Sequence, residues 1–181
     1  MMWIIVDRLA DVILRHAKGC IVEIGMGAST AVLVKHANQA RTVLHSVDID
    51  PRQINRKAAS NHMVHIMKSE EFIKSFTDTP ALVFIDGCHT HEMVRKEYDF
   101  FIERLAPGGV MFFHDTLPPN QSYTRHTLCG TVYELRHELE KDPTVDCFTW
   151  AYTAKNCGLT MVKKRAKSWP DVPKKELPRD L

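Results

Sequence analysis

The stretch that decides the fold is Cys20-Ile-Val-Glu-Ile-Gly-Met-Gly-Ala-Ser-Thr30. A short apolar run passes into a Gly-x-Gly turn and then into a segment suited to start a helix. Glycine at positions 25 and 27 adopts backbone angles that other residues resist, and it has no Cβ to obstruct a ligand. The N-terminus of the following helix would face that ligand. The stretch therefore predicts an α/β fold with a nucleotide-like ligand at this turn.

A carboxylate after the next apolar run supports ligand binding. Residues 42–47 are followed by Asp48-Ile-Asp50-Pro51, about 20 residues beyond the glycines, where a ribose hydroxyl would need an acceptor. Either acid could instead cap a helix that begins at Pro51. We assign capping to Asp50 and ligand binding to Asp48. The third glycine of a dinucleotide fingerprint is absent, which favours a nucleoside ligand without phosphates.

Composition predicts one domain with a basic tail. The 181 residues are 44% hydrophobic, enough for one sizeable core, which we place at residues 1–162. The formal net charge of +2 is too small to indicate a nucleic-acid binder. Residues 163–181 contain seven Lys or Arg, three acids and three prolines, so we expect an extended or mobile appendage.

Cysteine usage and hydropathy predict a cytoplasmic protein. The five cysteines form an odd number without CxxC spacing, which argues against a disulfide framework and for a reducing compartment. No apolar run reaches the roughly 20 residues of a membrane span, so we expect no membrane association. The sequence leaves open whether the chain forms a homo-oligomer.

The order of apolar runs predicts a doubly wound α/β sheet with helices on both faces. A leading helix is expected from about Trp3 to Ala17. Strands are expected near 20–25, 42–48, 63–67, 81–86 and 108–114, and helices near 29–38, 51–60, 69–76, 91–104 and 128–141. Two last runs, 145–152 and 159–162, are expected to form a hairpin that adds an antiparallel edge to an otherwise parallel sheet. The candidate ligand groups then lie at the carboxyl ends of strands, where such sheets bind ligands.

Two apolar strands deliver polar residues to this same edge. Residues 82–85 lead into Asp86-Gly-Cys-His-Thr-His91, and residues 108–113 end in His114-Asp115. Asp86 beside His89 suits proton transfer near neutral pH. The carboxylates of Asp86 and Asp115 with the imidazole of His114 would suit Mg²⁺ or Mn²⁺, and the histidine also admits Zn²⁺ or Fe²⁺.

Structural interpretations of these residues stay open. Asp86 could only cap a turn, and His89 or His91 could be an ordinary residue at the start of a helix. Ser29 and Thr30 are expected to cap a helix and line the ligand turn, because no G-x-S-x-G elbow surrounds them. Six scattered histidines are expected at the surface or in packing contacts; they are His36, His45, His62, His65, His126 and His137.

With these motifs in place, residues 20–162 resemble a class I S-adenosylmethionine-dependent methyltransferase with a Rossmann-like fold. Glu23-Ile-Gly-Met-Gly27 resembles the first motif of that family, and Leu105-Ala-Pro-Gly-Gly109 resembles the loop before its fifth strand. The stretch Phe84 to Glu92, followed by His114-Asp115, is similar to small-molecule O-methyltransferases of cephalosporin and macrolide-sugar biosynthesis. The resemblance implies S-adenosylmethionine as cofactor, and Mg²⁺ or another divalent cation as a second one.

The resemblance also implies roles for individual residues. It makes His89 the base, with Asp86 as a second catalytic residue, and gives Asp86, His114 and Asp115 to the metal. The cofactor site would consist of Glu23, Gly25, Met26, Gly27, Ser29, Thr30, Asp48, Ile49 and Ser69. The chain departs from the family pattern at His114, which replaces a carboxylate, at His91, which replaces an aromatic residue, and at Lys68, which replaces an aspartate.

We therefore expect methyl transfer to a hydroxyl of a small molecule, with a sugar among the candidate acceptors. Residues 116–129, with two prolines and several polar residues, are expected to form a loop over the site. One alternative is an NAD(P)-dependent oxidoreductase, which the missing third glycine disfavours. The other is a non-catalytic binding module that keeps the fold without the chemistry, an interpretation favoured by Lys68 and His114.

Overall fold

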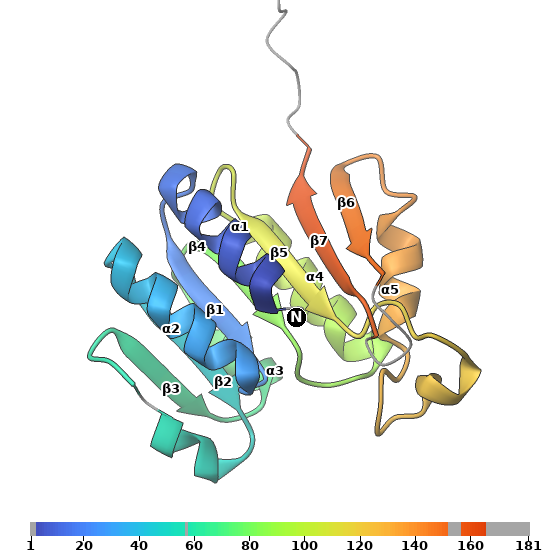
Figure 1. Ribbon diagram of the computed structural model, residues 1–181, viewed down its shortest axis with the longest axis horizontal. Coiled ribbons are helices and arrows are strands. Elements are labelled where there is room, and N and C mark those ends of the chain that lie inside the picture. The colour runs from blue at the N-terminus through green and yellow to red at the C-terminus, as the bar shows by residue number, and fades with distance from the viewer. Residues whose placement is uncertain (1–2, 57, 152–156, 166–181) are drawn as a thin grey trace, which may run out of the picture.

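A computed structural model describes residues 3–56, 58–151 and 157–165. Within them, one seven-stranded sheet has the order β3-β2-β1-β4-β5-β7-β6 (Figure 1). The first five strands are parallel, and β7 pairs antiparallel with both β5 and β6. This confirms the predicted parallel sheet with an antiparallel C-terminal edge. The strands are β1 Cys20–Ile24, β2 Leu44–Asp48, β3 His62–Ile66, β4 Pro80–Ile85, β5 Val110–His114, β6 Val145–Trp150 and β7 Leu159–Lys164.

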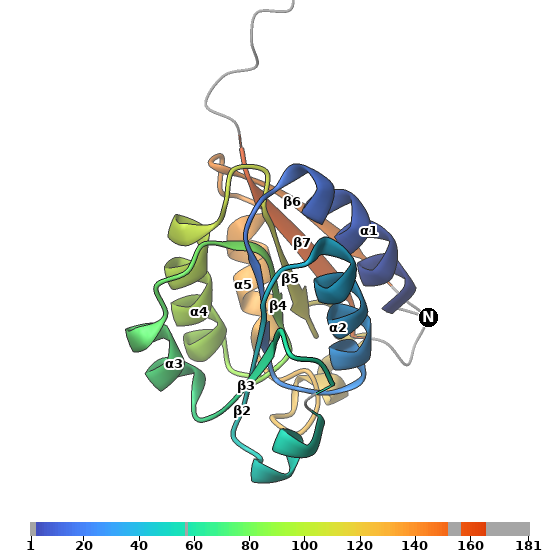
Figure 2. The same ribbon diagram turned by 90° about the vertical axis from the view of Figure 1, so that its left-hand side faces the viewer.

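Helices cover both faces of this sheet (Figure 2). Two pack on one face, namely α1 Trp3–His16 and α2 Ala28–Ala40, and three on the other, namely α3 Ser69–Ser75, α4 His91–Arg104 and α5 Val132–Leu139. Successive strand residues point to opposite faces. Ile21 and Leu82 accordingly pack with α1 and α2, whereas Val22 and Val83 pack with α3, α4 and α5. Two apolar cores with the sheet between them hold the fold.

The order of strands creates one place where ligands are expected. From β1 the chain crosses through α2 to β2 and on to β3, and then returns to add β4 on the other side of β1. The connections after β1 and β4 therefore diverge, which leaves a crevice at the carboxyl ends of these two strands. The glycine turn after β1 and the polar stretch after β4 both lie at this switch point.

Two predicted helices are shorter than expected. The segment predicted as a helix at 51–60 is a 3₁₀ helix, η1 Pro51–Arg56, because it buries no residue and so gains no packing to extend it. Asp50 caps it as predicted, since its carboxylate accepts the Arg52 N–H at 3.0 Å. The helix predicted from 128 begins only at Val132, after a second 3₁₀ helix, η2 Gln121–Thr124. Gly130 precedes it with φ +57°, a left-handed conformation that interrupts the helix.

Cysteine pairing differs from the prediction. Cys129 and Cys157 form a disulfide with Cα atoms 6.3 Å apart, while Cys20, Cys88 and Cys147 are free thiols. The count of cysteines could not reveal this pair, because pairing depends on proximity in the folded chain.

The last strand of the sheet extends beyond its predicted range of 159–162. Strand β7 continues to Lys164, two residues beyond the predicted end of the domain at 162. The rest of the predicted tail, from 166 on, and residues 152–156 lie outside the described residues. Across the described helices, none combines the length and the apolarity that a membrane crossing requires.

Candidate functional site

A cavity of about 510 Å³ opens at the switch point of the sheet. It is formed by the segments that follow β1, β2, β3 and β4, together with one residue of α4 and one of the loop after η2. This volume lies within the usual range for small-molecule and cofactor sites. The lining residues are Ile24, Gly25, Met26, Val47, Asp48, Ile49, Met67, Lys68, Ser69, Glu70, Asp86, Gly87, Cys88, His89, Met93 and His126.

The two glycines of the turn are required for different reasons. Gly25 has φ +86°, and an added Cβ would overlap the backbone carbonyl of Asp86, so only glycine fits. Gly27 has φ −163°, an extended backbone that any residue adopts, which corrects the expectation of a special backbone angle there. An added Cβ at Gly27 would meet no described atom within 4 Å. The backbone at Gly27 is therefore open to a ligand.

A buried carboxylate fixes this turn from behind. Glu23 is fully buried, and its Oε1 accepts hydrogen bonds from the hydroxyls of Ser29 at 2.6 Å and Thr30 at 3.0 Å. Its Oε2 accepts the Ser46 hydroxyl of β2 at 2.6 Å. Burial raises the pKa of Glu23 to about 7, although the three hydroxyl donors oppose the shift. Since Thr30 also accepts the Gly27 N–H at 3.1 Å, the network ties the turn to the first turn of α2.

Asp48 lies at the cavity where β2 ends. Its Oδ2 accepts the Met26 N–H of the glycine turn, and its Oδ1 accepts the Asp50 N–H, each at 2.8 Å. Each oxygen keeps a further lone pair for a ligand hydroxyl. The next residue, Ile49, is 73% exposed and also lines the cavity, so an apolar side chain stands beside the carboxylate.

Four titratable side chains converge where β4 and β5 end. The Nδ1 atom of His114 lies 3.1 Å from Asp86 Oδ1 and 3.0 Å from Asp115 Oδ1. The Nε2 atom of His89 lies 3.2 Å from Asp115 Oδ2 and 3.8 Å from Asp86 Oδ1. The two carboxylates thus alternate with the two imidazoles, and the four side chains come from the ends of two neighbouring strands.

The carboxylates change the protonation of both histidines. Burial would lower the pKa of His114, but Asp115 and Asp86 outweigh it and raise that pKa to about 10. The hydrogen bond with Asp86 raises the pKa of His89 above its ordinary value, against burial, and the charge of Asp115 adds to this effect. Burial acts to raise the pKa of Asp86, yet the two histidines prevail and hold it below its ordinary value. The imidazoles of His89 and His114 therefore each bind a proton more tightly than an ordinary histidine does.

The end of β5 has an unusual backbone and is joined to the loop over the site. Asp115 has φ +61°, a left-handed conformation that costs a non-glycine residue energy but that aspartate tolerates better than most residues. Its N–H donates to the Gly158 carbonyl at 3.1 Å. The disulfide of Cys129 and Cys157 joins the end of the predicted loop to the start of β7. His126 of that loop lines the cavity, which places one residue of the loop at the candidate site.

The structure brings some of the predicted site residues to the cavity and not others. Gly25, Met26, Asp48, Ile49, Ser69, Asp86 and His89 line it. His114 and Asp115 are absent from the lining but contact Asp86 and His89, which line the cavity. Glu23, Gly27, Ser29 and Thr30 are absent from the lining, and three of them hold the turn instead. Their contact with a cofactor remains a prediction.

Nine of the sixteen lining residues were not among the predicted site residues, and Met93 and His126 are two of them. Met93 lies in the first turn of α4, and its apolar character does not distinguish it from a packing residue. His126 was assigned to the surface or to packing, but it lines the cavity. The one available signal was its position inside the loop predicted to cover the site. His91, whose role was left open, begins α4 and pairs with Glu138 at 2.8 Å.

Comparison with known families decides the identity of the domain. A family described as a methyltransferase domain matches residues 22–116, more than half of the chain. The chain belongs to this methyltransferase family. The match begins in β1 and ends just after Asp115, so it includes the glycine turn, Asp48 and the four converging side chains. Among curated proteins, none matches the methyltransferase.

Solved structures confirm the fold of the methyltransferase. An O-methyltransferase from Bacillus cereus, in complex with SAH, has a TM-score of 0.72 at 13% identity, over 91% of this chain and 80% of that one. Cofactor-bound Rv0187 from MTB has a TM-score of 0.71 at 17% identity, over 89% and 78%. MycE from the mycinamycin pathway, in complex with Mg and SAH, has a TM-score of 0.62 at 17% identity, over 97% of this chain and 51% of that one.

Proposed function

We propose that the protein transfers the methyl group of S-adenosylmethionine to a hydroxyl of a small molecule. The family match supports methyl transfer. Support for this cofactor comes from similar structures whose titles name SAH, the demethylated product of S-adenosylmethionine. The hydroxyl acceptor is supported by the imidazole and the carboxylates that meet beside the cavity.

The cofactor would lie between the glycine turn and Asp48. The open backbone at Gly27 allows close approach, and the Asp48 carboxylate is held by two N–H donors so that its free lone pairs point to a fixed place. A pair of ribose hydroxyls would donate to it. Ile49 and Met67 offer apolar surface for the base. No phosphate subsite is needed, since the cofactor has none.

Methyl transfer then requires little from the protein beyond alignment and proton removal. The acceptor oxygen forms a bond to the methyl carbon while the bond from carbon to sulfur breaks, and the electron pair stays on sulfur, which loses its positive charge. The proton of the hydroxyl passes to neutral His89. Asp86 and Asp115 then stabilise the imidazolium that forms, which follows from the raised pKa of His89.

The observation that carries this proposal is the position of His89. Its Nε2 atom faces two carboxylates at 3.2 and 3.8 Å, it lines the cavity, and it is 26% exposed, so an acceptor can reach it. A histidine that only starts a helix would need none of these features.

The same residues fit a divalent cation. One ligand atom from each of Asp86, His114 and Asp115 lies within 4.8 Å of the others, and two carboxylates with an imidazole are acceptable ligands for Mg²⁺, Mn²⁺, Zn²⁺ or Fe²⁺. A cation bound there would lower the pKa of the acceptor hydroxyl. Its positive charge would compete with a protonated His114, so the residue must lose its proton before it can act as a ligand.

The first experiment tests the cofactor. The purified protein is titrated calorimetrically with S-adenosylmethionine, S-adenosylhomocysteine and NAD, each with and without Mg²⁺. We expect binding of the first two and none of NAD. Asp48→Asn should weaken the affinities for S-adenosylmethionine and S-adenosylhomocysteine about tenfold or more. The reason is that the amide nitrogen of asparagine cannot accept a hydrogen bond from a ribose hydroxyl, whereas both carboxylate oxygens can. Binding of NAD alone would establish the oxidoreductase alternative.

The second experiment tests the base. Transfer of labelled methyl groups from S-adenosylmethionine is measured with a panel of sugars and catechols. His89→Ala should lower turnover by about 10²–10⁴-fold, while the affinity for S-adenosylhomocysteine stays within about threefold of wild type. His91→Ala is the matched control, because His91 is two residues away and pairs with Glu138 outside the cavity lining. Equal turnover in wild type and His89→Ala would refute the assignment. Cofactor binding without any transfer would favour the non-catalytic module.

A further inference from the structure

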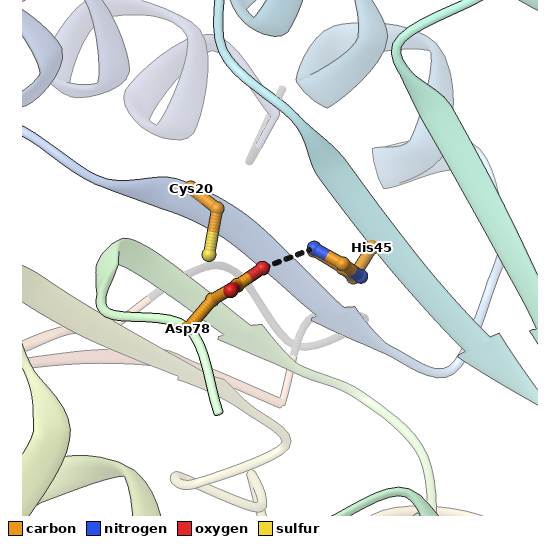
Figure 3. A group of neighbouring side chains, drawn as sticks. All are labelled: Cys20, His45 and Asp78. Carbon is orange, nitrogen blue, oxygen red and sulfur yellow. Dashed lines mark ion pairs between the residues drawn. The ribbon is translucent and has the colours of Figure 1, made fainter. Parts of the chain in front are cut away.

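A second group of potential ligands lies at the opposite end of the sheet from the candidate active site. Cys20 is the first residue of β1, His45 is the second residue of β2, and Asp78 precedes β4. Figure 3 shows the three side chains turned toward one another, with the carboxylate of Asp78 between the sulfur and the imidazole. We call these three residues the Cys20 group. Its place at the amino ends of the strands separates it from the cavity.

The spacing of the Cys20 group suits a metal ion. One ligand atom of each residue lies within 4.8 Å of the other two, and His45 Nε2 is 3.2 Å from Asp78 Oδ2. Four ligands arranged around Zn²⁺ at 2.0–2.3 Å would stand about 3.3–3.8 Å apart. A small contraction, made by the exposed Asp78, would close the group around an ion. Cys20 and His45 are each only 7% exposed, so two of the ligands are already fixed by the sheet.

The contacts within the group are poor without an ion. The Nε2 atom of His45 is buried, and among the described residues it faces the Asp78 carboxylate at 3.2 Å without a hydrogen bond of good geometry. The Cys20 thiol donates a weak hydrogen bond to the Thr79 carbonyl at 3.7 Å. A buried nitrogen without a directed partner is costly, and a cation between the three atoms would satisfy all of them.

A second histidine holds His45 in the orientation that a ligand requires. The Nε2 atom of His65 lies 3.1 Å from His45 Nδ1, and the two rings stack with centroids 5.3 Å apart. Phe72 and Phe76 enclose His45 from the helical side. Burial lowers the pKa of both histidines, which favours the neutral imidazole. A ligating histidine commonly uses its other nitrogen for such a hydrogen bond.

We propose that Cys20, His45 and Asp78 bind a divalent cation of the zinc class. The cysteine selects Zn²⁺ over Mg²⁺ or Ca²⁺, which prefer oxygen ligands. Charge supports the assignment, because one thiolate and one carboxylate neutralise an ion of charge +2. Burial raises the pKa of the Cys20 thiol to about 12, so the thiol keeps its proton when no ion is bound. An ion that binds to the sulfur displaces this proton, which leaves for solvent. Three protein ligands leave the fourth position to water at the exposed side of Asp78.

The bound ion would join segments that are distant in the chain. It would connect the starts of β1 and β2 to the segment before β4. It would lie at the amino ends of these strands and would not touch the cavity. Its role would therefore be structural. Ligand binding to the native state alone raises the melting temperature, which makes stability a second readout.

The experiment uses Co²⁺ as a spectroscopic probe in place of Zn²⁺. The chelator-treated full-length protein, with the Cys129–Cys157 disulfide intact, is titrated with Co²⁺ and then with Zn²⁺. Coordination by a thiolate gives a charge-transfer band in the near ultraviolet, which carboxylates and imidazoles cannot give, so Co²⁺ at Asp86, His114 and Asp115 is silent in this readout. We expect one equivalent of Co²⁺ to produce the band and Zn²⁺ to remove it.

Variants locate the site. Cys20→Ala should abolish the band, whereas Cys88→Ala, which removes the free thiol near the candidate active site, should retain it. Asp78→Asn should weaken Zn²⁺ binding at least tenfold and remove the gain in melting temperature; since Asp78 is exposed, this variant should fold even if Cys20→Ala does not. Asp11→Asn, an exposed acid of α1, is the matched control. No band in the wild type, a band kept by Cys20→Ala, or unchanged affinity in Asp78→Asn would each overturn the proposal.

Discussion

Glu97 should make the protein less stable at neutral pH than at mildly acidic pH. It lies in α4, it is fully buried, and neither carboxylate oxygen accepts a hydrogen bond of good geometry from the part of the chain that the structure describes. Burial raises its pKa from 4.5 to about 7; the nearby Ser69 hydroxyl opposes this shift and the charge of Glu70 adds to it. The folded state therefore binds a proton that the unfolded state has already lost.

The sign and size follow from this difference in pKa. Below pH 4.5 both states carry the proton, and Glu97 costs nothing. Between pH 4.5 and about 7 only the folded state keeps it, so stability falls as pH rises. Each pH unit in this window costs up to about 1.4 kcal/mol, which amounts to about 3 kcal/mol over the whole window. Above pH 7 the cost is constant, because the buried carboxylate is ionised.

Glu97→Gln removes the titration and keeps the shape of the side chain. Urea unfolding followed by circular dichroism at a series of pH values from 4.5 to 8 gives the free energy of unfolding of both proteins. The variant should gain on the wild type by about 3 kcal/mol across this range. Glu103→Gln, at an exposed position of the same helix, should change the pH dependence little. A difference between Glu97→Gln and wild type that stays constant within about 1 kcal/mol would refute the reasoning. Other titrating groups, Glu23 among them, cancel in this comparison.

Three further predictions concern the glycine turn and the disulfide. Gly25→Ala should destabilise the fold by about 1–3 kcal/mol or more, because φ is +86° and the new Cβ would overlap the Asp86 carbonyl; thermal unfolding checks this, and an unchanged melting temperature would contradict it. Gly27→Ala should leave the melting temperature nearly unchanged but weaken S-adenosylhomocysteine binding in calorimetry, since its Cβ would point into open space where the ligand is expected. Equal affinity of the variant and the wild type would show that the ligand does not approach Gly27. Reduction or Cys129→Ser should cost about 3–4 kcal/mol, because the bridge to Cys157 closes a loop with a sequence separation of 28; urea unfolding with and without reductant measures this, and equal midpoints would exclude it.

Much of the fold followed from local patterns. Apolar runs alternate with helical stretches, so the strands from β1 to β5 lie within a few residues of their predicted positions. The failures are also local in origin. The segment after Asp50 begins with a proline and has an N-terminal cap, but it buries no side chain. A segment with helix-start signals and no buried face does not extend into a long helix. The end of the loop before α5 contains Gly130, which has a left-handed conformation and leaves no room for a Cβ beside the backbone of His89.

The candidate site was predictable in part, because local sequence patterns also show which residues follow the buried strands. Asp86, His89 and the pair His114-Asp115 each follow a buried strand, and parallel neighbouring strands bring their carboxyl ends together. The sequence could not show that Glu23 faces Ser29 and Thr30 and that all three hold the turn. That arrangement depends on how α2 packs beside β1 in the folded chain, because the packing decides which side chains of α2 meet Glu23.

By itself the sequence determined the class of fold, the glycine turn and the edge of the sheet that carries the candidate site, because these follow from the period of hydrophobicity and from the needs of single residues. Only the tertiary structure decided which distant side chains meet. It paired Cys129 with Cys157, placed His126 at the cavity, and brought Cys20, His45 and Asp78 to one point. The physical reason is that contacts between distant segments depend on strand order and loop paths, and residue spacing along the chain carries little information about either.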